Sequence, residues 1–297
     1  MAHSHEIEQV STSKLVFTIV LNGVITAAQI IGGIVSGSLA LISDAIHNLS
    51  DMVSVILAYA AQLLGQKPNT RKSTFGYKRA EILAAFINAL SLIGISVFLV
   101  FEAIDRMSNL PEVDARWMFW LGLLGLVANG ISVLILEKEK NKSINIKAAY
   151  LHLLGDALTS LAVILGAVLI WLFEIYWIDP VVTIVISIYL FVHTIQLLRE
   201  SVTILMQMAP SNLNSSEIEH RLTELEGLKN VHHIHLWNLT DKLIHFECHI
   251  ALTEDIKVSE TNRLFEQIRE ILHDEFDIEH VTIQFEYAPN HKQQCGY

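Results

Sequence analysis

Two histidine–aspartate pairs lie within apolar stretches of this sequence. His47 and Asp51 belong to S-D-A-I-H-N-L-S-D, and His152 and Asp156 belong to Y-L-H-L-L-G-D-A. A spacing of four residues places both members of a pair on one face of a helix. Two imidazole nitrogens and two carboxylate oxygens complete the tetrahedral coordination that Zn²⁺ prefers. The pairs therefore predict one metal site shared by two helices.

The apolar surroundings make these four side chains costly. An ionisable group at the centre of a bilayer costs about 2.5–3.5 kcal/mol on insertion scales. A shared metal ion gives all four groups a common partner, and the alternative is a metal-free network of interhelical hydrogen bonds. Because the same pair occurs twice in long apolar runs, the metal site is the favoured interpretation.

Two more ionisable residues lie in apolar runs. Asp44 lies one turn before His47 and has two open interpretations. It is either a carboxylate that admits the metal or accepts a proton, or a helix-end residue near an outer loop. His193 is alone in its run, and we expect an interior histidine with satisfied hydrogen bonds.

The elements that carry the pairs are expected to be membrane-spanning helices. The chain has 297 residues, 52% of them hydrophobic and 17% charged, and its mean hydropathy is +0.43. A helix needs about 20 apolar residues to cross the hydrocarbon core. Six stretches meet this requirement, namely 15–35, 39–64, 80–104, 117–136, 148–172 and 181–198. We therefore predict an all-α six-helix transmembrane bundle.

Basic residues predict the orientation of this bundle. The loop after the second stretch carries Lys67, Arg71, Lys72, Lys78 and Arg79, and the loop after the fourth carries Lys138, Lys140, Lys142 and Lys147. The positive-inside rule places both loops in the cytoplasm. With six spans, both termini are then cytoplasmic. The polar, acidic start of the chain predicts no cleavable signal.

The remaining sequence predicts two smaller parts, an N-terminal arm (1–14) and a cytoplasmic domain (209–297) beside the transmembrane domain (15–208). In the C-terminal part we expect helices at 215–226 and 258–275. Strands are expected at 231–239, 243–252 and 279–287. The order αββαβ indicates a small sheet backed by helices, an α+β domain.

The C-terminal part is acidic and rich in histidine. Residues 211–297 contain sixteen Asp and Glu against seven Lys and Arg, a net charge of −9, and nine of the fourteen histidines. Such a domain is a poor partner for nucleic acid and a fair one for cations. The two cysteines, Cys248 and Cys295, are too few for a disulfide framework and fit a reducing compartment.

A second metal site is expected on the predicted strands. They bring nitrogen, oxygen and sulfur donors, namely His232, His233, His235, His245, Glu247, Cys248, His249, His280 and Glu286. Residues 245, 247 and 249 share one face of their strand. Converging strands would assemble a mixed nitrogen–oxygen site from this set.

The H-x-x-x-D pairs, F-G-Y-K-R-A-E-I-L-A-A-F-I-N-A, V-H-H-I-H-L-W and V-T-I-Q-F-E together resemble the cation diffusion facilitator family. The similarity covers about residues 14–289 and is closest to bacterial zinc and cobalt–zinc–cadmium exporters. It implies a homodimer of six-helix bundles in the inner (plasma) membrane. It also implies cytoplasmic domains of the metallochaperone, ferredoxin-like type.

The resemblance also assigns site residues. His47, Asp51, His152 and Asp156 would form the transport site, in a composition typical of zinc-selective members. The cytoplasmic metal positions would fall on His232, His249, His280 and Glu286, with His235 adjacent. The two basic loops lack the His/Asp cluster and the long His-rich insert of some members, so we predict no metal site in either loop. His3 and His5 of the N-terminal arm could bind a metal ion, and an inert arm is the favoured interpretation.

The expected function is Zn²⁺/H⁺ antiport out of the cytoplasm by alternating access, with Cd²⁺, Co²⁺ and Ni²⁺ as other cations that these ligands accept. His47 and His152 are the expected protonation switches, because imidazole titrates near neutral pH. Zinc is expected as cargo and as a regulator, with no organic cofactor and no enzyme activity. Two alternatives remain, an intramembrane metalloenzyme and a zinc-sensing membrane scaffold that moves nothing. The sequence holds no H-E-x-x-H motif that would favour the enzyme.

Overall fold

The computed structural model describes residues 12–137 and 144–287. His3, His5, Lys138, Lys140, Lys142 and Cys295 lie outside these residues. The chain divides into two units. One runs through Tyr59 and from Ile87 to Leu197, and the other from Ala60 to Phe86 and from Leu198 onward.

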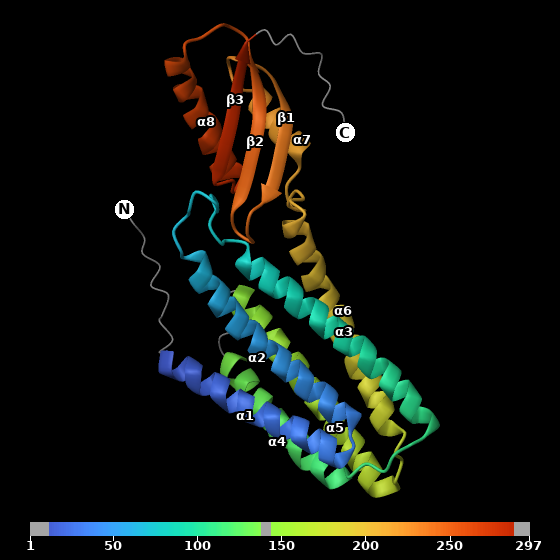
Figure 1. The fold of residues 1–297 in the computed structure, drawn as a ribbon. Helices are drawn as coiled ribbons and strands as arrows, with labels where there is room; N and C mark the ends of the chain where they lie inside the picture. Colours follow the sequence, from blue (N-terminus) through green and yellow to red (C-terminus); the bar gives the residue numbers. More distant parts are fainter. Residues whose placement is uncertain (1–11, 138–143, 288–297) are drawn as a thin grey trace. The chain divides into compact units, whose positions relative to one another are not determined.

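Six long helices occupy the six predicted stretches in the described part of the chain (Figure 1). They are α1 (Thr12–Ser36), α2 (Leu39–Gly65), α3 (Ala80–Ser108), α4 (Ala115–Glu137), α5 (Ile144–Phe173) and α6 (Ile178–Leu205). Within α2 to α6, five segments are long and apolar enough to cross a membrane, and Asn22–Ser36 of α1 is a shorter apolar helix. The predicted helical membrane domain is confirmed.

Close helix contacts hold the first unit together. α4 lies against α5 and α1, and a core of small and aliphatic side chains fills the space between α2, α4, α5 and α6. Gly155 of α5 permits one such contact, because a Cβ atom there would lie 2.2 Å from the Tyr189 hydroxyl of α6. Close approach of this kind is how helices associate in a bilayer, where no hydrophobic force drives them together.

The start of α2 is fixed by a residue far along the chain. Asp179, at the start of α6, accepts hydrogen bonds from the Ser38 hydroxyl and from the backbone N–H groups of Leu39 (2.8 Å) and Ala40 (3.2 Å). These N–H groups have no partner inside the helix, and a carboxylate at a helix N-terminus also favours the helix dipole. The cap therefore fixes the first residue of α2, and with it the position of His47 and Asp51 along the helix axis.

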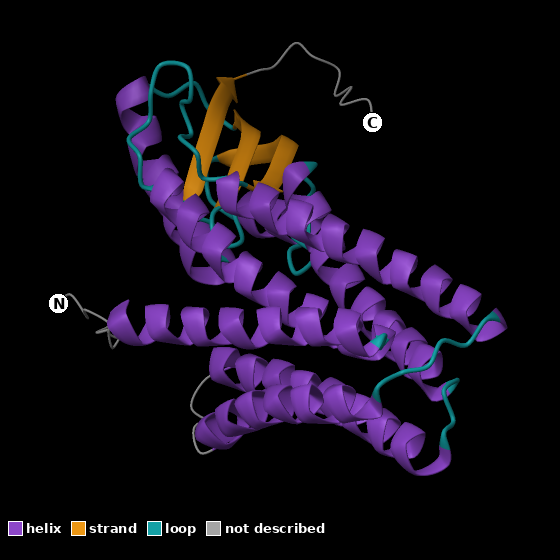
Figure 2. Ribbon diagram, turned by 60° about the horizontal axis from the view of Figure 1, so that its bottom comes forward, coloured by secondary structure: helices purple, strands orange, loops and turns teal. Residues whose placement is uncertain are grey.

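The second unit contains the predicted αββαβ order. α7 (Ser215–Thr223), β1 (Leu228–Asn238), β2 (Ile244–Leu252), α8 (Val258–Phe276) and β3 (His280–Tyr287) follow one another, and Figure 2 shows the strands side by side in one sheet. The strand order is β1-β2-β3. β1 and β2 are antiparallel, whereas β2 and β3 are parallel. The parallel pair needs a crossover connection, and α8 supplies it.

One face of this sheet is apolar and the other carries the histidines. Val231, Phe246, Cys248 and Ile250 point into a core that α7 and α8 complete with Ile218, Leu222, Ile268 and Leu272. Because side chains alternate along a strand, the intervening residues of β1 and β2 face the other way. The histidine-rich motif is thereby displayed on the face that the helices leave uncovered.

Cys248 is expected to resist alkylation while the domain is folded. Burial raises the pKa of its thiol to about 12, because the thiolate would lose its hydration in the apolar core. At pH 8 the peptide that contains Cys248 should remain unmodified by iodoacetamide in native protein and become modified in denaturant, as peptide mass spectrometry would show. Rapid modification of native protein would contradict this placement.

Candidate metal centres

The two H-x-x-x-D pairs meet in the first unit. The Nε2 atom of His47 on α2 lies 2.8 Å from an Asp156 carboxylate oxygen on α5 and 3.6 Å from Asp51. The Nε2 atom of His152 lies 3.5 Å from Asp51 and 3.8 Å from Asp156. Each carboxylate therefore lies within 4 Å of both imidazoles, so the four side chains from two helices form one group.

The four side chains differ in access. His47 and Asp156 are buried, whereas the side chain of His152 is 39% exposed and that of Asp51 is 34% exposed. A ligand atom from each of His47, Asp51 and Asp156 lies within 4.8 Å of the others. One half of the group is thus fixed in the protein interior, and the other half is open to an arriving ion.

A cavity of about 270 Å³ borders the group. Its polar lining includes Asn22 and Thr26 of α1, Asn48 of α2 and Asn129 of α4, together with Asp51, His152 and Asp156. Amide and hydroxyl groups of this kind can replace part of the hydration shell of a cation. The rest of the lining is mostly apolar, so the cavity brings a few polar groups beside three of the four ligand side chains, Asp51, His152 and Asp156.

The structure places Asp44 and His193, the two other ionisable residues that the sequence singled out in apolar runs. Asp44 is fully buried and accepts hydrogen bonds from Thr159 (2.9 Å), Ser160 (3.1 Å) and Gln29 (3.3 Å). Asp44 does lie near the start of α2, in its second turn, but its carboxylate is buried and bonded to other helices. His193 is exposed and stacks on His152, with ring centroids 6.3 Å apart, so the interior position expected for it is wrong.

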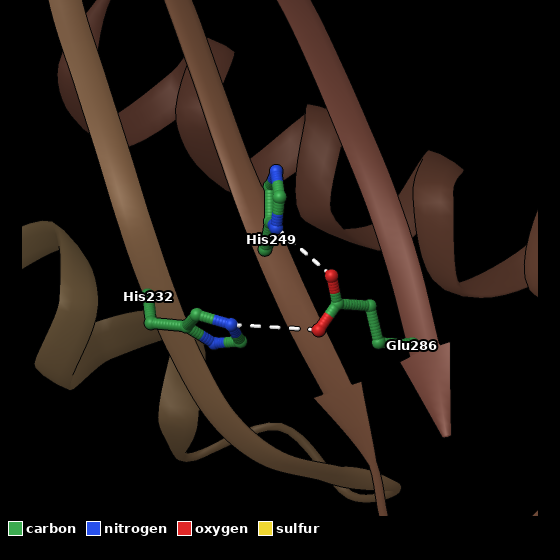
Figure 3. A group of neighbouring side chains, drawn as sticks. All are labelled: His232, His249 and Glu286. Carbon is green, nitrogen blue, oxygen red and sulfur yellow. Dashed lines mark ion pairs between the residues drawn. The ribbon is translucent and has the colours of Figure 1, made fainter. Parts of the chain in front are cut away.

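A second group lies on the uncovered face of the sheet (Figure 3). Glu286 of β3 approaches His249 of β2 at 2.9 Å and His232 of β1 at 3.5 Å. A ligand atom from each residue lies within 4.8 Å of the others, and all three side chains are partly exposed. Two imidazoles and a carboxylate leave room for a further ligand in tetrahedral coordination.

The register of the sheet explains this grouping. His232 and His249 are direct partners across the antiparallel pair, and Glu286 lies opposite Ala251 in the parallel pair. Each of the three strands thus contributes one side chain at the same end of the sheet.

The structure does not bring His280 or His235 into this group. His280 begins β3 and pairs with His245 at the start of β2, with ring centroids 4.3 Å apart. Six residues of strand, about 20 Å, separate it from Glu286. His235 lies opposite Glu247. Burial, together with the charges of His280, Lys78 and Arg79, lowers the pKa of His245 to about 4, so His245 is neutral at physiological pH.

The polar neighbours of Asp44 were missed by sequence reasoning. Gln29, Thr159 and Ser160 are ordinary in type, and small or polar residues in a span usually indicate only close packing. Asp179 gave no signal either, because its partners lie 139 to 141 residues away in sequence. Neither contact has a recognisable spacing.

Comparison with known proteins covers almost the whole chain. Residues 15–206 match the family described as the cation efflux transmembrane domain, and residues 210–288 match the cation efflux protein cytoplasmic domain. A solved structure, the metal-bound C-terminal domain of the CzcD transporter of Cupriavidus metallidurans, matches 25% of this chain and 99% of that chain at 32% identity, with a TM-score of 0.23.

Full-length relatives are also similar. The metal cation efflux system protein CzcD of Cupriavidus metallidurans is 36% identical, over 97% of this chain and 90% of the relative. The cadmium, cobalt and zinc/H(+)-K(+) antiporter of Bacillus subtilis is 37% identical over 98% and 94%. The zinc transporter ZitB of Escherichia coli is 34% identical over 99% and 96%. These matches confirm the family resemblance, and the chain belongs to the cation efflux family of membrane transporters, the cation diffusion facilitators.

Proposed function

We propose that this cation efflux transporter exports Zn²⁺ from the cytoplasm in exchange for protons, with His47, Asp51, His152 and Asp156 as its transport site. The observation that carries the proposal is the grouping of these four side chains beside a cavity that three of them line. Two imidazoles and two carboxylates match the donor set and number that zinc prefers.

Charge supports an exchange of metal for protons. A zinc ion binds neutral imidazole and ionised carboxylate, so protons compete with it for every ligand. Two carboxylates balance the 2+ charge, which matters in a bilayer where a net charge is costly. Protonation of His47 and His152 from the opposite side would displace the metal, and return of those protons to the cytoplasm completes the cycle.

Cadmium and cobalt are proposed as further cargo. The Bacillus subtilis relative is named for cadmium, cobalt and zinc, and the Escherichia coli relative for zinc alone. Histidine and aspartate ligands accept all three metals, because geometry and availability, more than ligand type, discriminate between them. The family is one of transporters and not of enzymes.

The proposed organisation has an N-terminal arm (1–14), a transmembrane domain (15–208) and a cytoplasmic regulatory domain (209–297). The basic loop at residues 66–79 and the positive-inside rule favour cytoplasmic termini and an inner-membrane location. We propose that the protein is a homodimer and that zinc binding to its two cytoplasmic domains regulates transport. Zinc bound at His232, His249 and Glu286 would reduce the repulsion between two acidic domains of about −9 each.

Zinc uptake into proteoliposomes under an imposed pH gradient tests the transport proposal, with wild type beside Asp51→Ala. Gradient-dependent uptake in wild type that disappears in Asp51→Ala is the expected result, and liposomes without a gradient are the control. Absence of movement in both proteins, with zinc still bound to the cytoplasmic domain, would instead support a zinc-sensing scaffold.

Glu286→Gln is expected to weaken zinc binding by the cytoplasmic domain at least about tenfold, the lower end of what loss of even a supporting partner of a metal ligand costs. Calorimetric titration of the purified protein would measure this. Glu254→Gln is the matched control, because Glu254 is exposed in the same domain and the variant has the same change in charge. Equal weakening by both variants would mean that overall charge, and not coordination, attracts the metal.

A further inference from the structure

Polar side chains are buried one turn beyond the cavity in three helices. In α1, Asn22 and Thr26 line the cavity and Gln29 follows. In α2, which runs in the opposite direction, Asp51 and Asn48 line the cavity, and Asp44 lies one turn before Asn48. In α5, His152 and Asp156 line it, and Thr159 and Ser160 follow. We call Gln29, Asp44, Thr159 and Ser160 the polar plug, and its members are at most 7% exposed.

Hydrogen bonds join the polar plug across three helices. Ser160 and Thr159 of α5 donate to the carboxylate of Asp44 in α2 at 3.1 and 2.9 Å. Gln29 of α1 donates to Oδ2 of Asp44, the oxygen that also accepts from Ser160, at 3.3 Å, and accepts from Asn48 of the cavity wall at 3.3 Å. The Asp44 carboxylate is therefore the common acceptor that holds these helices together.

α4 packs against the polar plug at Gly125, which has no side chain. A Cβ atom at Gly125 of α4 would lie 2.5 Å from the Gln29 amide nitrogen and 3.3 Å from the Ser160 hydroxyl. Gly125 also borders the cavity. The α4 backbone thus packs directly against the plug, with no space for a side chain between them.

We propose that the polar plug is the gate on the release side of the transport path: its hydrogen bonds keep that side closed while the cavity side is open, and they must break for the metal to leave. The proposal rests on the proposed function, since it needs a cargo that crosses from the cavity side. It makes Asp44 a positioning residue, distinct from the four ligands.

The Thr159 hydroxyl has two hydrogen-bond acceptors within reach, so it can exchange one for the other. Its hydroxyl lies 2.9 Å from Asp44 and also 2.9 Å from the backbone carbonyl oxygen of Asp156. A hydroxyl has one proton to donate, so it can leave Asp44 and bond to its own helix without becoming unsatisfied. Separation of α5 from α2 therefore has a low cost at this residue, and the alternative acceptor belongs to a proposed metal ligand.

Side-specific labelling tests the gate. Val55 of α2 lines the cavity and is exposed. Val55→Cys would be placed in a background with Cys248→Ala and Cys295→Ala and treated with a membrane-impermeant maleimide. With an intact plug we expect labelling in inverted membrane vesicles and not in intact cells. With Asp44→Ala, labelling in intact cells should rise at least about tenfold, since several interhelical hydrogen bonds of the closed state are lost.

Two further variants make the result decisive. Thr159→Val combined with Ser160→Ala removes the donors and should reproduce the effect, including where Asp44→Ala fails to accumulate. Ser43→Ala is the control, because Ser43 is fully buried beside Asp44 and its hydroxyl has no hydrogen-bond partner among the described residues. It should label as the intact plug does.

The outcomes separate the gate from the transport proposal. Labelling only in inverted vesicles for both plug variants, with zinc binding retained, would overturn the gate. Labelling of the intact-plug protein in intact cells and not in inverted vesicles would overturn the proposed orientation instead. Increased labelling of Ser43→Ala equal to that of Asp44→Ala would show that general loosening of α2, and not the plug, is responsible.

Discussion

Asp156→Asn is expected to lower zinc transport at least about 100-fold. Asp156 is buried, lies 2.8 Å from His47 and 3.8 Å from His152, and is one of the two carboxylates in the group. The asparagine preserves shape and removes one negative charge, so a zinc-loaded site would carry a net positive charge inside the membrane. A charge there costs about 2.5–3.5 kcal/mol, which corresponds to roughly 100-fold in binding.

The measurement is the initial rate of zinc uptake into proteoliposomes at matched protein content. Asp105→Asn is the matched control, because Asp105 is an exposed carboxylate at the end of α3 and far in sequence from both pairs. It should transport at the wild-type rate. Calorimetry on the same samples should show that Asp156→Asn keeps the zinc bound by the cytoplasmic domain. Wild-type transport by Asp156→Asn would remove this residue from the site.

Asp179→Asn is expected to destabilise the membrane domain. The carboxylate is buried and receives three hydrogen bonds at the start of α2, two at Oδ1 and one at Oδ2. Asparagine keeps only one oxygen, so at least one of these donors loses its acceptor. A buried donor without an acceptor costs about 1–3 kcal/mol. For a domain of this size, a loss of about 2 kcal/mol lowers Tm by about 4–8 °C.

Thermal unfolding of the detergent-purified protein would measure this loss. Glu174→Gln is the matched control, because Glu174 is an exposed acid in the turn that precedes α6 and the variant has the same change in charge. It should unfold at the wild-type temperature. Because the cap also sets the position of His47, Asp179→Asn should in addition slow zinc uptake. An unchanged Tm together with unchanged uptake would contradict the role of the cap.

Local sequence patterns made the elements of this protein predictable. Apolar runs of about 20 residues favour spanning helices, since a helix satisfies every backbone polar group inside the bilayer. All six runs became helices. The αββαβ order of the C-terminal part was equally readable, because alternation marks strands wherever one face of a sheet is covered. The order of the strands and the parallel pairing of β2 with β3 were not readable.

The membrane metal group shows which site residues the local sequence pattern can predict and which it cannot. The spacing of His47 and Asp51 predicts a shared helix face, and the same spacing at His152 and Asp156 predicts a partner, so the membrane group could be named before its geometry was known. His193 could not be placed, because its orientation depends on how α6 rotates against α5. Asp44 could not be placed either, since its three partners come from two other helices.

The sequence by itself determined the membrane helices, the αββαβ domain and the residue types of both metal groups, because apolar length, alternation and ligand spacing are local properties. Tertiary structure alone decided which histidine meets Glu286. Parallel pairing of β2 and β3 aligns the strand starts with each other and the strand ends with each other, so His280 pairs with His245 while Glu286 reaches His249 and His232. It also decided that Asp44 is a buried acceptor between helices, since only packing brings α1, α2 and α5 together at that height.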